Sequence, residues 1–182
     1  MDGSTAGRLL VATPTLLDPN FSRAVLLMIE HDHEGAIGVI LNREVDHPAA
    51  EHVPEWADHL VEPPHVFIGG PVAPEMAIGL AYRPRVEDPA WPSVLDRIGT
   101  IDLSEPPGAI PDVEALRVFA GYAGWGAGQL EFEIAAGSWF VLDARHDDVF
   151  TRDPSGLWRR VVRRQRSRVA LYADHPFDPA TN

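Results

Sequence analysis

The sequence lacks two residue types, cysteine and lysine, and all 15 of its basic residues are arginine. Without lysine there is no P-loop lysine to hold a phosphate and no amine for Schiff-base catalysis. Without cysteine there is no thiolate nucleophile, no disulfide and no iron–sulfur ligand set, and a zinc site would need histidine and carboxylate ligands. The remaining chemistry therefore belongs to His, Glu, Arg and backbone amides.

Long apolar runs are missing as well. No window approaches the ~18 consecutive apolar residues of a membrane-spanning helix, and the N-terminus lacks the basic region and long apolar run of a signal peptide. We therefore expect a cytoplasmic protein without a membrane partner. The 182 residues, 45% of them apolar, predict one domain over residues 1–182.

Positive charge is scarce over most of the chain. Residues 1–144 hold 7 arginines and 22 acidic residues, a net charge of −15, whereas residues 145–168 hold 8 arginines and 3 acidic residues, a net charge of +5. The acidic part repels phosphate, so nucleic acid is an unfavourable partner for most of the molecule.

The basic segment has helical periodicity. Asp153 as N-cap and Pro154 at the first position predict a helix over 154–169, with Leu157, Trp158 and Val161 on its apolar side. The opposite side carries Arg159, Arg160, Arg163, Arg164 and Arg166. We favour a docked helix with a solvated arginine face; the alternative is a face that binds an anion, a nucleic acid or an acidic partner.

Short apolar segments separated by turn residues predict the fold. Strands are expected over 8–12, 23–30, 36–42, 66–68, 78–82, 98–103, 117–122 and 138–142, with a hairpin turn at 31–35. Helices are expected near 54–60, 112–116 and 129–136. Strands joined by hairpins, with helices mostly in the second half, favour an α+β class over a doubly wound sheet.

The segment Glu30–Glu34 is the best metal candidate. His31 and His33 lie at i and i+2, which places them on one face of a strand, and imidazole with carboxylate suits zinc or manganese. We favour a solvated hairpin turn, because no third distant ligand is evident. No cofactor is expected.

Residues 121–128 contain four glycines before a helix start. Their backbone N–H groups could cradle an anion. Glu131 and Glu133 in the first turns of the helix would repel a phosphate, however. Glycine's conformational freedom, which allows a tight turn around Trp125, is the favoured explanation.

A wider polar and glycine-rich set forms the ligand-binding hypothesis, because a pocket with convergent polar groups is the usual form of a binding site. Its members are Arg23, His31, Asn42, Arg43, Gly69, Gly70, Tyr122, Gly124, Trp125, Gly126, Gln129, Glu131 and Glu133. His31 with Glu131 or Glu133 would make an acid–base pair. The alternative is that Arg23 or Arg43 pairs with these glutamates to balance buried charge.

Several phrases resemble the AlgH/YqgE family of small bacterial proteins. They are Gly7–Pro14, Asp18–Phe21, Gly35–Gly38, Gly69–Val72 and above all Gly121–Glu133, and the resemblance covers roughly residues 7–175. It implies an α+β fold with a bifurcated, largely antiparallel sheet closing into a pseudo-barrel, and a bacterial cytosolic protein. It implies no reaction, although the label of transcriptional regulator is attached to the family. Glu44 stands where a proline is common, and Ile78-Gly79-Leu80 where many members have a Leu-His pair.

Three functions are consistent with these observations. The first is a non-enzymatic regulatory or ligand-binding protein, acting through a small molecule at the glycine–tryptophan segment or a protein partner at the arginine helix. The first alternative is a small hydrolase or transferase using His31 with Glu131 or Glu133. The second is a DNA-binding regulator acting through the helix at 154–169. The oligomeric state stays open.

Overall fold

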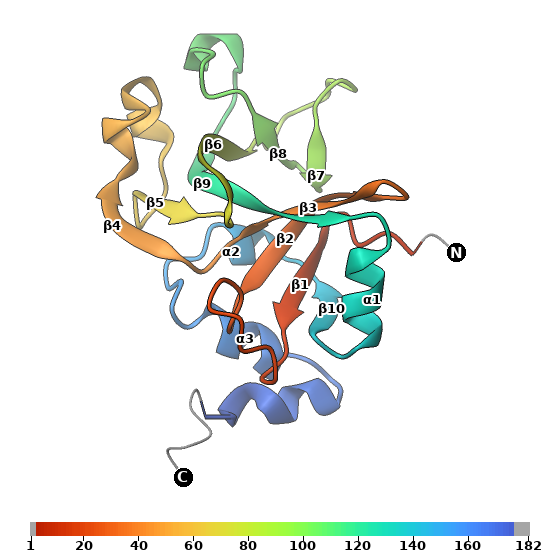
Figure 1. The fold of residues 1–182 in the computed structure, drawn as a ribbon. Coiled ribbons are helices and arrows are strands. Elements are labelled where there is room, and N and C mark those ends of the chain that lie inside the picture. Colours follow the sequence, from red (N-terminus) through yellow and green to blue (C-terminus); the bar gives the residue numbers. More distant parts are fainter. Residues whose placement is uncertain (1–2, 177–182) are drawn as a thin grey trace.

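A computed structural model describes residues 3–176 and shows one large curled sheet (Figure 1). Its main path runs β10-β1-β2-β3-β9-β6-β8-β7 with antiparallel neighbours. The strands are β1 (Arg8–Ala12), β2 (Val25–Asp32), β3 (Gly35–Ile40), β6 (Val72–Tyr82), β7 (Ser93–Leu95), β8 (Ile98–Ile101), β9 (Ala115–Gly126) and β10 (Trp139–Asp143). Strand β4 (Glu44–Pro48) pairs with β5 (His65–Ile68), which lies parallel to β9. The expected α+β class with a largely antiparallel sheet is confirmed.

Strand β9 is where the sheet divides. Its first part pairs with β6 and β5, and its second part pairs with β3. Gly121 lies between the two parts with φ +70°, a conformation that favours glycine. In Figure 1, β9 crosses the middle of the molecule, with β6, β7 and β8 above it and β4 and β5 on the left. This geometry confirms the bifurcated sheet that the resemblance implies.

The strands β1 and β2 are buried on both faces. Leu9 and Val11 belong to one core cluster with helix α3 (Leu157–Arg163), whereas Leu10 and Ala12 belong to a second cluster near helix α1 (Gln129–Ala135). Because successive side chains of a strand point to opposite faces, two covered faces demand a continuous apolar run. The sequence shows such runs in both strands.

The helix predicted over 154–169 is wrong in length. Helix α3 ends at Arg163, and a separate 3₁₀ helix, η4, covers Arg168–Asp174. Ser167 separates the two helices, since its side chain accepts a hydrogen bond from the backbone N–H of Val169 and starts a new turn. The arginines beyond Arg163 therefore do not continue one regular helical face.

Two further expectations need correction. The helix expected at 112–116 is absent from the described residues, where Asp112 has φ +63° and Ala115 already begins β9. The expected glycine turn at 121–128 is strand as far as Gly126. The remaining short elements are η1 (Ala49–Glu51), η2 (Pro54–His59), η3 (Pro107–Ala109) and α2 (His146–Val149). Over residues 3–176, no helix has the length and apolar character needed to cross a bilayer.

Candidate functional site

The described residues enclose a groove of about 620 Å³, within the size range of small-molecule sites. It lies between the turn before β2, the connection from β3 to β4, and the start of α3. We call it the arginine groove. Its lining residues are Ser22, Arg23, Asn42, Arg43, Glu44, Val45, Ile68, Pro154, Ser155 and Trp158. The groove brings together three of the residues predicted from the sequence, Arg23, Asn42 and Arg43.

Arg23 forms the floor of this groove. It is 8% exposed, has φ +59°, and its guanidinium carbon lies 4.2 Å from the ring centroid of Trp158. Burial lowers the pKa of Arg23 from its ordinary value. A bulky residue in the left-handed region costs about 1–3 kcal/mol and persists only where surrounding structure imposes it. Such strain is concentrated at functional positions in proteins.

Asn42 and Arg43 hold the turn that carries Arg23. The Asn42 amide accepts from the backbone N–H of Val25 at 2.9 Å and donates to the carbonyl of Arg23 at 2.8 Å. The Arg43 guanidinium donates to the carbonyls of Pro19 at 3.1 Å and Ser22 at 2.9 Å. Burial lowers the pKa of Arg43, and the charge of Asp18 opposes that change. Both arginines therefore stay close to the groove through backbone contacts.

A second hollow of about 410 Å³ shares Arg23, Ser155 and Trp158 with the arginine groove. The chain's own C-terminal segment lines it. Arg23 donates to the carbonyls of His175 at 3.1 Å and Pro176 at 2.6 Å. Backbone carbonyls therefore occupy one edge of the Arg23 guanidinium.

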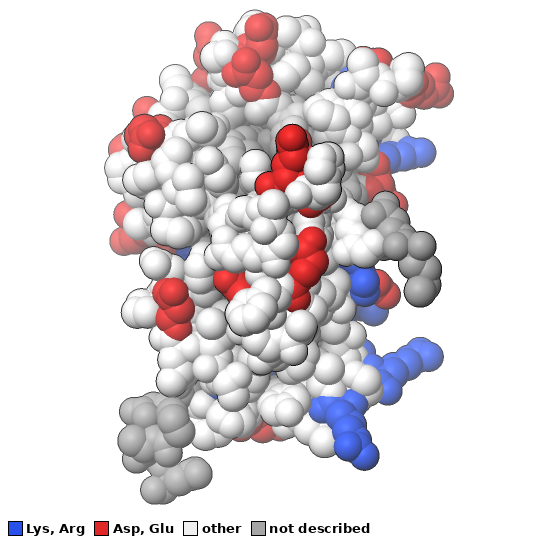
Figure 2. Space-filling view, turned by 45° about the vertical axis from the view of Figure 1, so that its right-hand side comes forward, with Lys and Arg blue, Asp and Glu red and all other residues white. Residues whose placement is uncertain are grey.

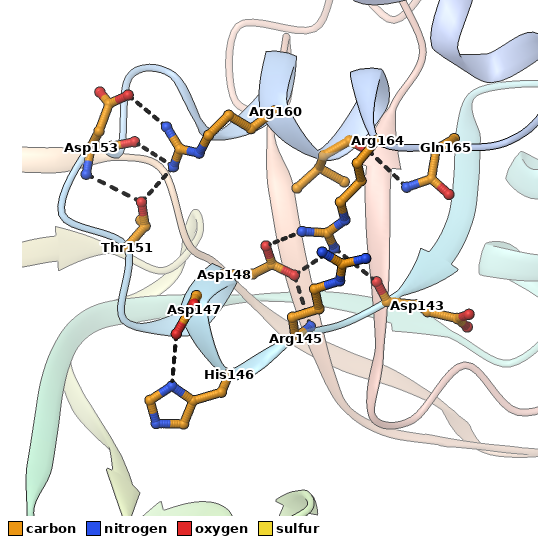
Figure 3. A network of polar contacts seen from close by, with 11 residues as sticks. Asp143, Arg145, His146, Asp147, Asp148, Thr151, Asp153, Arg160, Arg164 and Gln165 are labelled. Carbon is orange, nitrogen blue, oxygen red and sulfur yellow. Dashed lines mark hydrogen bonds and ion pairs between the residues drawn. The ribbon is translucent and has the colours of Figure 1, made fainter.

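The arginines of α3 and the residues just after it mostly face acidic groups of the same chain. Arg159 and Arg163 both contact Asp174, at 2.9 and 2.8 Å. Arg160 contacts Asp153 and Thr151 (Figure 3). The arginine face, for which anion or partner binding was the alternative to a solvated surface, thus makes most of its contacts within the molecule.

Arg164 makes the most buried of these pairs (Figure 3). Its two terminal nitrogens lie 2.6 and 2.7 Å from the carboxylate of Asp148, which is 4% exposed at its side chain. The backbone N–H of Arg145 donates to the same carboxylate at 2.8 Å. No partner is recorded for Arg166, the last arginine of the predicted face, within residues 3–176.

Charge remains segregated on the surface despite this pairing. Figure 2 shows acidic side chains scattered from the top to the lower part of one face, whereas the arginine side chains in view project mainly along its right-hand side.

His31 lies in a different place from the arginine groove. Its side chain is 4% exposed, and its Nε2 lies 3.0 Å from the Glu131 carboxylate, as one of the predicted acid–base pairs requires. The backbone N–H of Thr5 donates to Nδ1 at 3.1 Å, so Nδ1 bears the lone pair and Nε2 bears the proton. A hydrogen bond from a backbone N–H and, next, the hydrogen bond with His31 lower the pKa of Glu131. Both ring nitrogens are therefore occupied.

The metal candidate gains no support from this arrangement. His33 lines a hollow of about 210 Å³ with His31, Asp32 and Glu131. No group of three His, Cys, Asp or Glu side chains in residues 3–176 is placed to hold a metal ion.

Glu133 organises two indole rings rather than a catalytic pair. The Nε1 groups of Trp125 and Trp139 both donate to its Oε2 at 2.9 Å, and Gln129 donates to its Oε1 at 3.1 Å. The Gln129 amide oxygen accepts from the backbone N–H of Gly126 at 3.1 Å. This cluster joins α1 to β9 and β10, so these predicted site residues have a packing role here.

The predicted glycines at 69 and 70 allow close contact between backbones. A side chain at Gly69 would lie 2.2 Å from the carbonyl oxygen of Gly121, and one at Gly70 would lie 2.1 Å from the carbonyl carbon of Tyr122. Gly124 lies in β9 opposite Ile37 of β3. The predicted ligand-binding residues thus lie in four separate places: the arginine groove, the hollow at His31, the cluster around Glu133, and the close backbone contacts at the glycines.

The predicted ligand-binding set lacked seven of the ten groove residues, namely Ser22, Glu44, Val45, Ile68, Pro154, Ser155 and Trp158. Trp158 was assigned only to the apolar side of a helix, and its stacking on Arg23 joins positions 135 residues apart. The signal for Val45 and Ile68 is weak but readable, because both are apolar residues in short strands with exposed side chains.

Sequence and structure comparisons point to one group of proteins. The AlgH-like family model matches residues 9–170. The chain is 48% identical to a UPF0301 protein of Streptomyces coelicolor, covering 98% of this chain and 96% of that protein, and 46% identical to one of Thermobifida fusca over the same shares. A crystal structure from Corynebacterium diphtheriae superimposes with a TM-score of 0.87 at 32% identity, covering 94% of this chain and 93% of that chain. The solution structure of AlgH from Pseudomonas aeruginosa gives 0.68 at 24% identity, covering 97% and 96%, which shows a shared fold.

Proposed function

The chain belongs to the AlgH-like family, and from that premise and from the arginine groove we propose that it is a non-enzymatic protein that binds a small anion. The observation that carries the proposal is the meeting of Arg23 and Arg43 in one groove, with Arg23 buried in a strained backbone conformation above Trp158. Guanidinium groups bind carboxylates and phosphates with charge-assisted hydrogen bonds. The anion would lie on the groove side of these two arginines.

Arg43 is the group best placed to meet such a ligand. Its recorded contacts go to backbone carbonyls, and no carboxylate within 4.0 Å neutralises it in residues 3–176. Glu44, which also lines the groove, lies 2.5 Å from Nδ1 of His65. Asp18 acts on the Arg43 charge from a distance, but the groups that accept its hydrogen bonds are neutral carbonyls, so the guanidinium can still attract an incoming anion.

The proposal also states where in the cell the protein acts and what anion binding does. We place the protein in the bacterial cytosol, and binding of a metabolite-sized anion would be the input of a regulatory protein. The acid–base alternative has less support, since Thr5 occupies the Nδ1 lone pair of His31 that a general base would use. The DNA-binding alternative has less support, since Arg159, Arg160, Arg163 and Arg164 face carboxylates of the same chain.

The test is a titration of the protein with inorganic phosphate and with acetate at low ionic strength, in which the backbone amide chemical shifts are monitored by NMR. We expect shifts confined to residues of the arginine groove. Arg43→Gln should weaken binding by about tenfold or more, because a hydrogen bond to a charged group contributes about 1.5–3 kcal/mol. Arg43→Lys should recover part of the affinity, because it restores the charge without the planar fork.

The control is Arg85→Gln, since Arg85 is exposed and lies outside the groove. Thermal unfolding of each variant separates lost binding from lost folding. Absence of anion-dependent shifts at the groove, or equal affinities of Arg43→Gln and Arg85→Gln, would overturn the proposal.

A further inference from the structure

The wall of the arginine groove carries two apolar side chains that the anion site does not use. Val45 is 37% exposed and Ile68 is 40% exposed, and both line the groove. Branched apolar side chains of sheet strands are usually buried, and single exposed ones need no explanation. Here two of them border one groove that also holds cations.

Strand geometry places these side chains beside Arg43. Arg43 directly precedes β4 and lies two residues before Val45, and both side chains line the groove. The backbone N–H of Ile68 donates to the carbonyl of Arg43 at 2.8 Å, which makes Ile68 the neighbour of Arg43 across the strands. The cation and the two apolar side chains therefore line the same groove, with Glu44 between Arg43 and Val45 in the sequence.

We propose that the groove selects an amphiphilic anion, a molecule with a carboxylate or phosphate head and an aliphatic body. The head contacts Arg43, and the aliphatic body covers Val45 and Ile68. This inference rests on the proposed function and adds the chemical class of the ligand. The groove offers such a molecule both a cation, Arg43, and exposed apolar side chains, Val45 and Ile68.

A free molecule is the committed occupant, rather than a lipid bilayer. The chain carries a net charge of −12, which opposes approach to an anionic membrane. The apolar side chains also line a groove together with Pro154 and Trp158. A single aliphatic chain can enter such a groove, whereas a flat bilayer surface cannot follow it.

The experiment measures Kd for acetate, butyrate, hexanoate and octanoate by calorimetry with the full chain, at constant ionic strength. Burial of one methylene contributes about 0.8 kcal/mol, so we expect affinity to rise about fourfold per methylene while the chain stays within the groove. Hexyl phosphate against hexanoate compares the two head groups. Hexanol should bind at least tenfold more weakly than hexanoate, because it lacks the charge.

Matched variants test the surface. Val45→Thr and Ile68→Thr should each reduce the gain per methylene, while leaving acetate binding unchanged. Val72→Thr is the control, since Val72 is 38% exposed on β6 and does not line the groove. Two independent variants are used so that one that fails to fold leaves the other informative.

The outcomes separate the two proposals. If acetate binds in an Arg43-dependent way and longer chains bind no more tightly, the amphiphile inference is wrong and the anion site stands. If no carboxylate or phosphate binds, both are wrong. Co-sedimentation with phosphatidylglycerol vesicles that Val45→Thr abolishes would replace the free ligand with a membrane and overturn the inference.

Discussion

Replacing Arg164 by methionine should destabilise the protein more than the same change at Arg159, Arg160 or Arg163. The substitution keeps an aliphatic side chain and removes the charge, which leaves the Asp148 carboxylate, 4% exposed, without its two guanidinium donors at 2.6 and 2.7 Å. Breaking a buried ion pair costs about 3–5 kcal/mol. The Arg164 side chain is 20% exposed and the Arg145 N–H still donates, so we expect a loss of about 2–3 kcal/mol.

Urea unfolding followed by circular dichroism measures this loss, and thermal unfolding should show a decrease in Tm of about 4–12 °C for a chain of this length. Arg163→Met is the matched control one residue earlier. Its pair with Asp174 has side chains 60% and 72% exposed, so the change should cost less than about 1 kcal/mol. The double variant Asp148→Asn with Arg164→Met should recover part of the stability, because no buried charge remains.

The reasoning would be refuted by equal free energies of unfolding for Arg164→Met and Arg163→Met. A double variant less stable than Arg164→Met alone would equally show that the unpaired Asp148 charge is not the source of the loss.

Two other predictions concern the remaining predicted site residues. Gly70→Ala should lower the free energy of unfolding by about 1–3 kcal/mol or more, because its new methyl group would lie 2.1 Å from the backbone of Tyr122. Gly108→Ala is the control, since a methyl group there has no neighbour within 4 Å and should not lower the stability. Chemical denaturation compares the two variants, and equal stabilities would contradict the packing role of Gly70. The pKa of Glu131 is lowered from 4.5, mainly by a backbone hydrogen bond and next by the hydrogen bond with His31. The ionised carboxylate therefore stabilises the folded state above pH 4.5, and this contribution is lost as the pH falls through the lower pKa of the folded state. Glu131→Gln should therefore flatten the acid side of a stability-against-pH curve measured by urea unfolding, and an unchanged curve would contradict that contribution.

Much of the fold could be predicted because its signals are local. The apolar run at 8–12 is β1, and the hairpin expected around 31–35 joins β2 to β3. Apolar continuity over these strands reflects burial on both faces. The helix at 154–169 was predicted too long, because periodicity extends through Arg164 and Gln165 without revealing that Ser167 begins a new turn.

The candidate site could be predicted only in part. Arg23, Asn42 and Arg43 belong to the polar and glycine-rich set predicted to bind a ligand, and the structure places these three in one groove. Their assumed neighbours, His31 and Glu133, lie elsewhere with partners of their own. Which polar residues meet depends on how strands distant in sequence pair, and that information is not local.

The sequence by itself determined the absence of lysine and thiol chemistry, the acidic and basic segments, and the short strands of an α+β fold, because composition and periodicity follow directly from residue order. The tertiary structure alone decided what each charge faces. In the folded chain most of the α3 arginines face aspartates of the same chain. His31 forms hydrogen bonds with Thr5 and Glu131, and Arg23 stacks on Trp158, 135 residues away in the sequence. Electrostatic and stacking interactions act over a few ångströms, so their partners are defined only once the chain has folded.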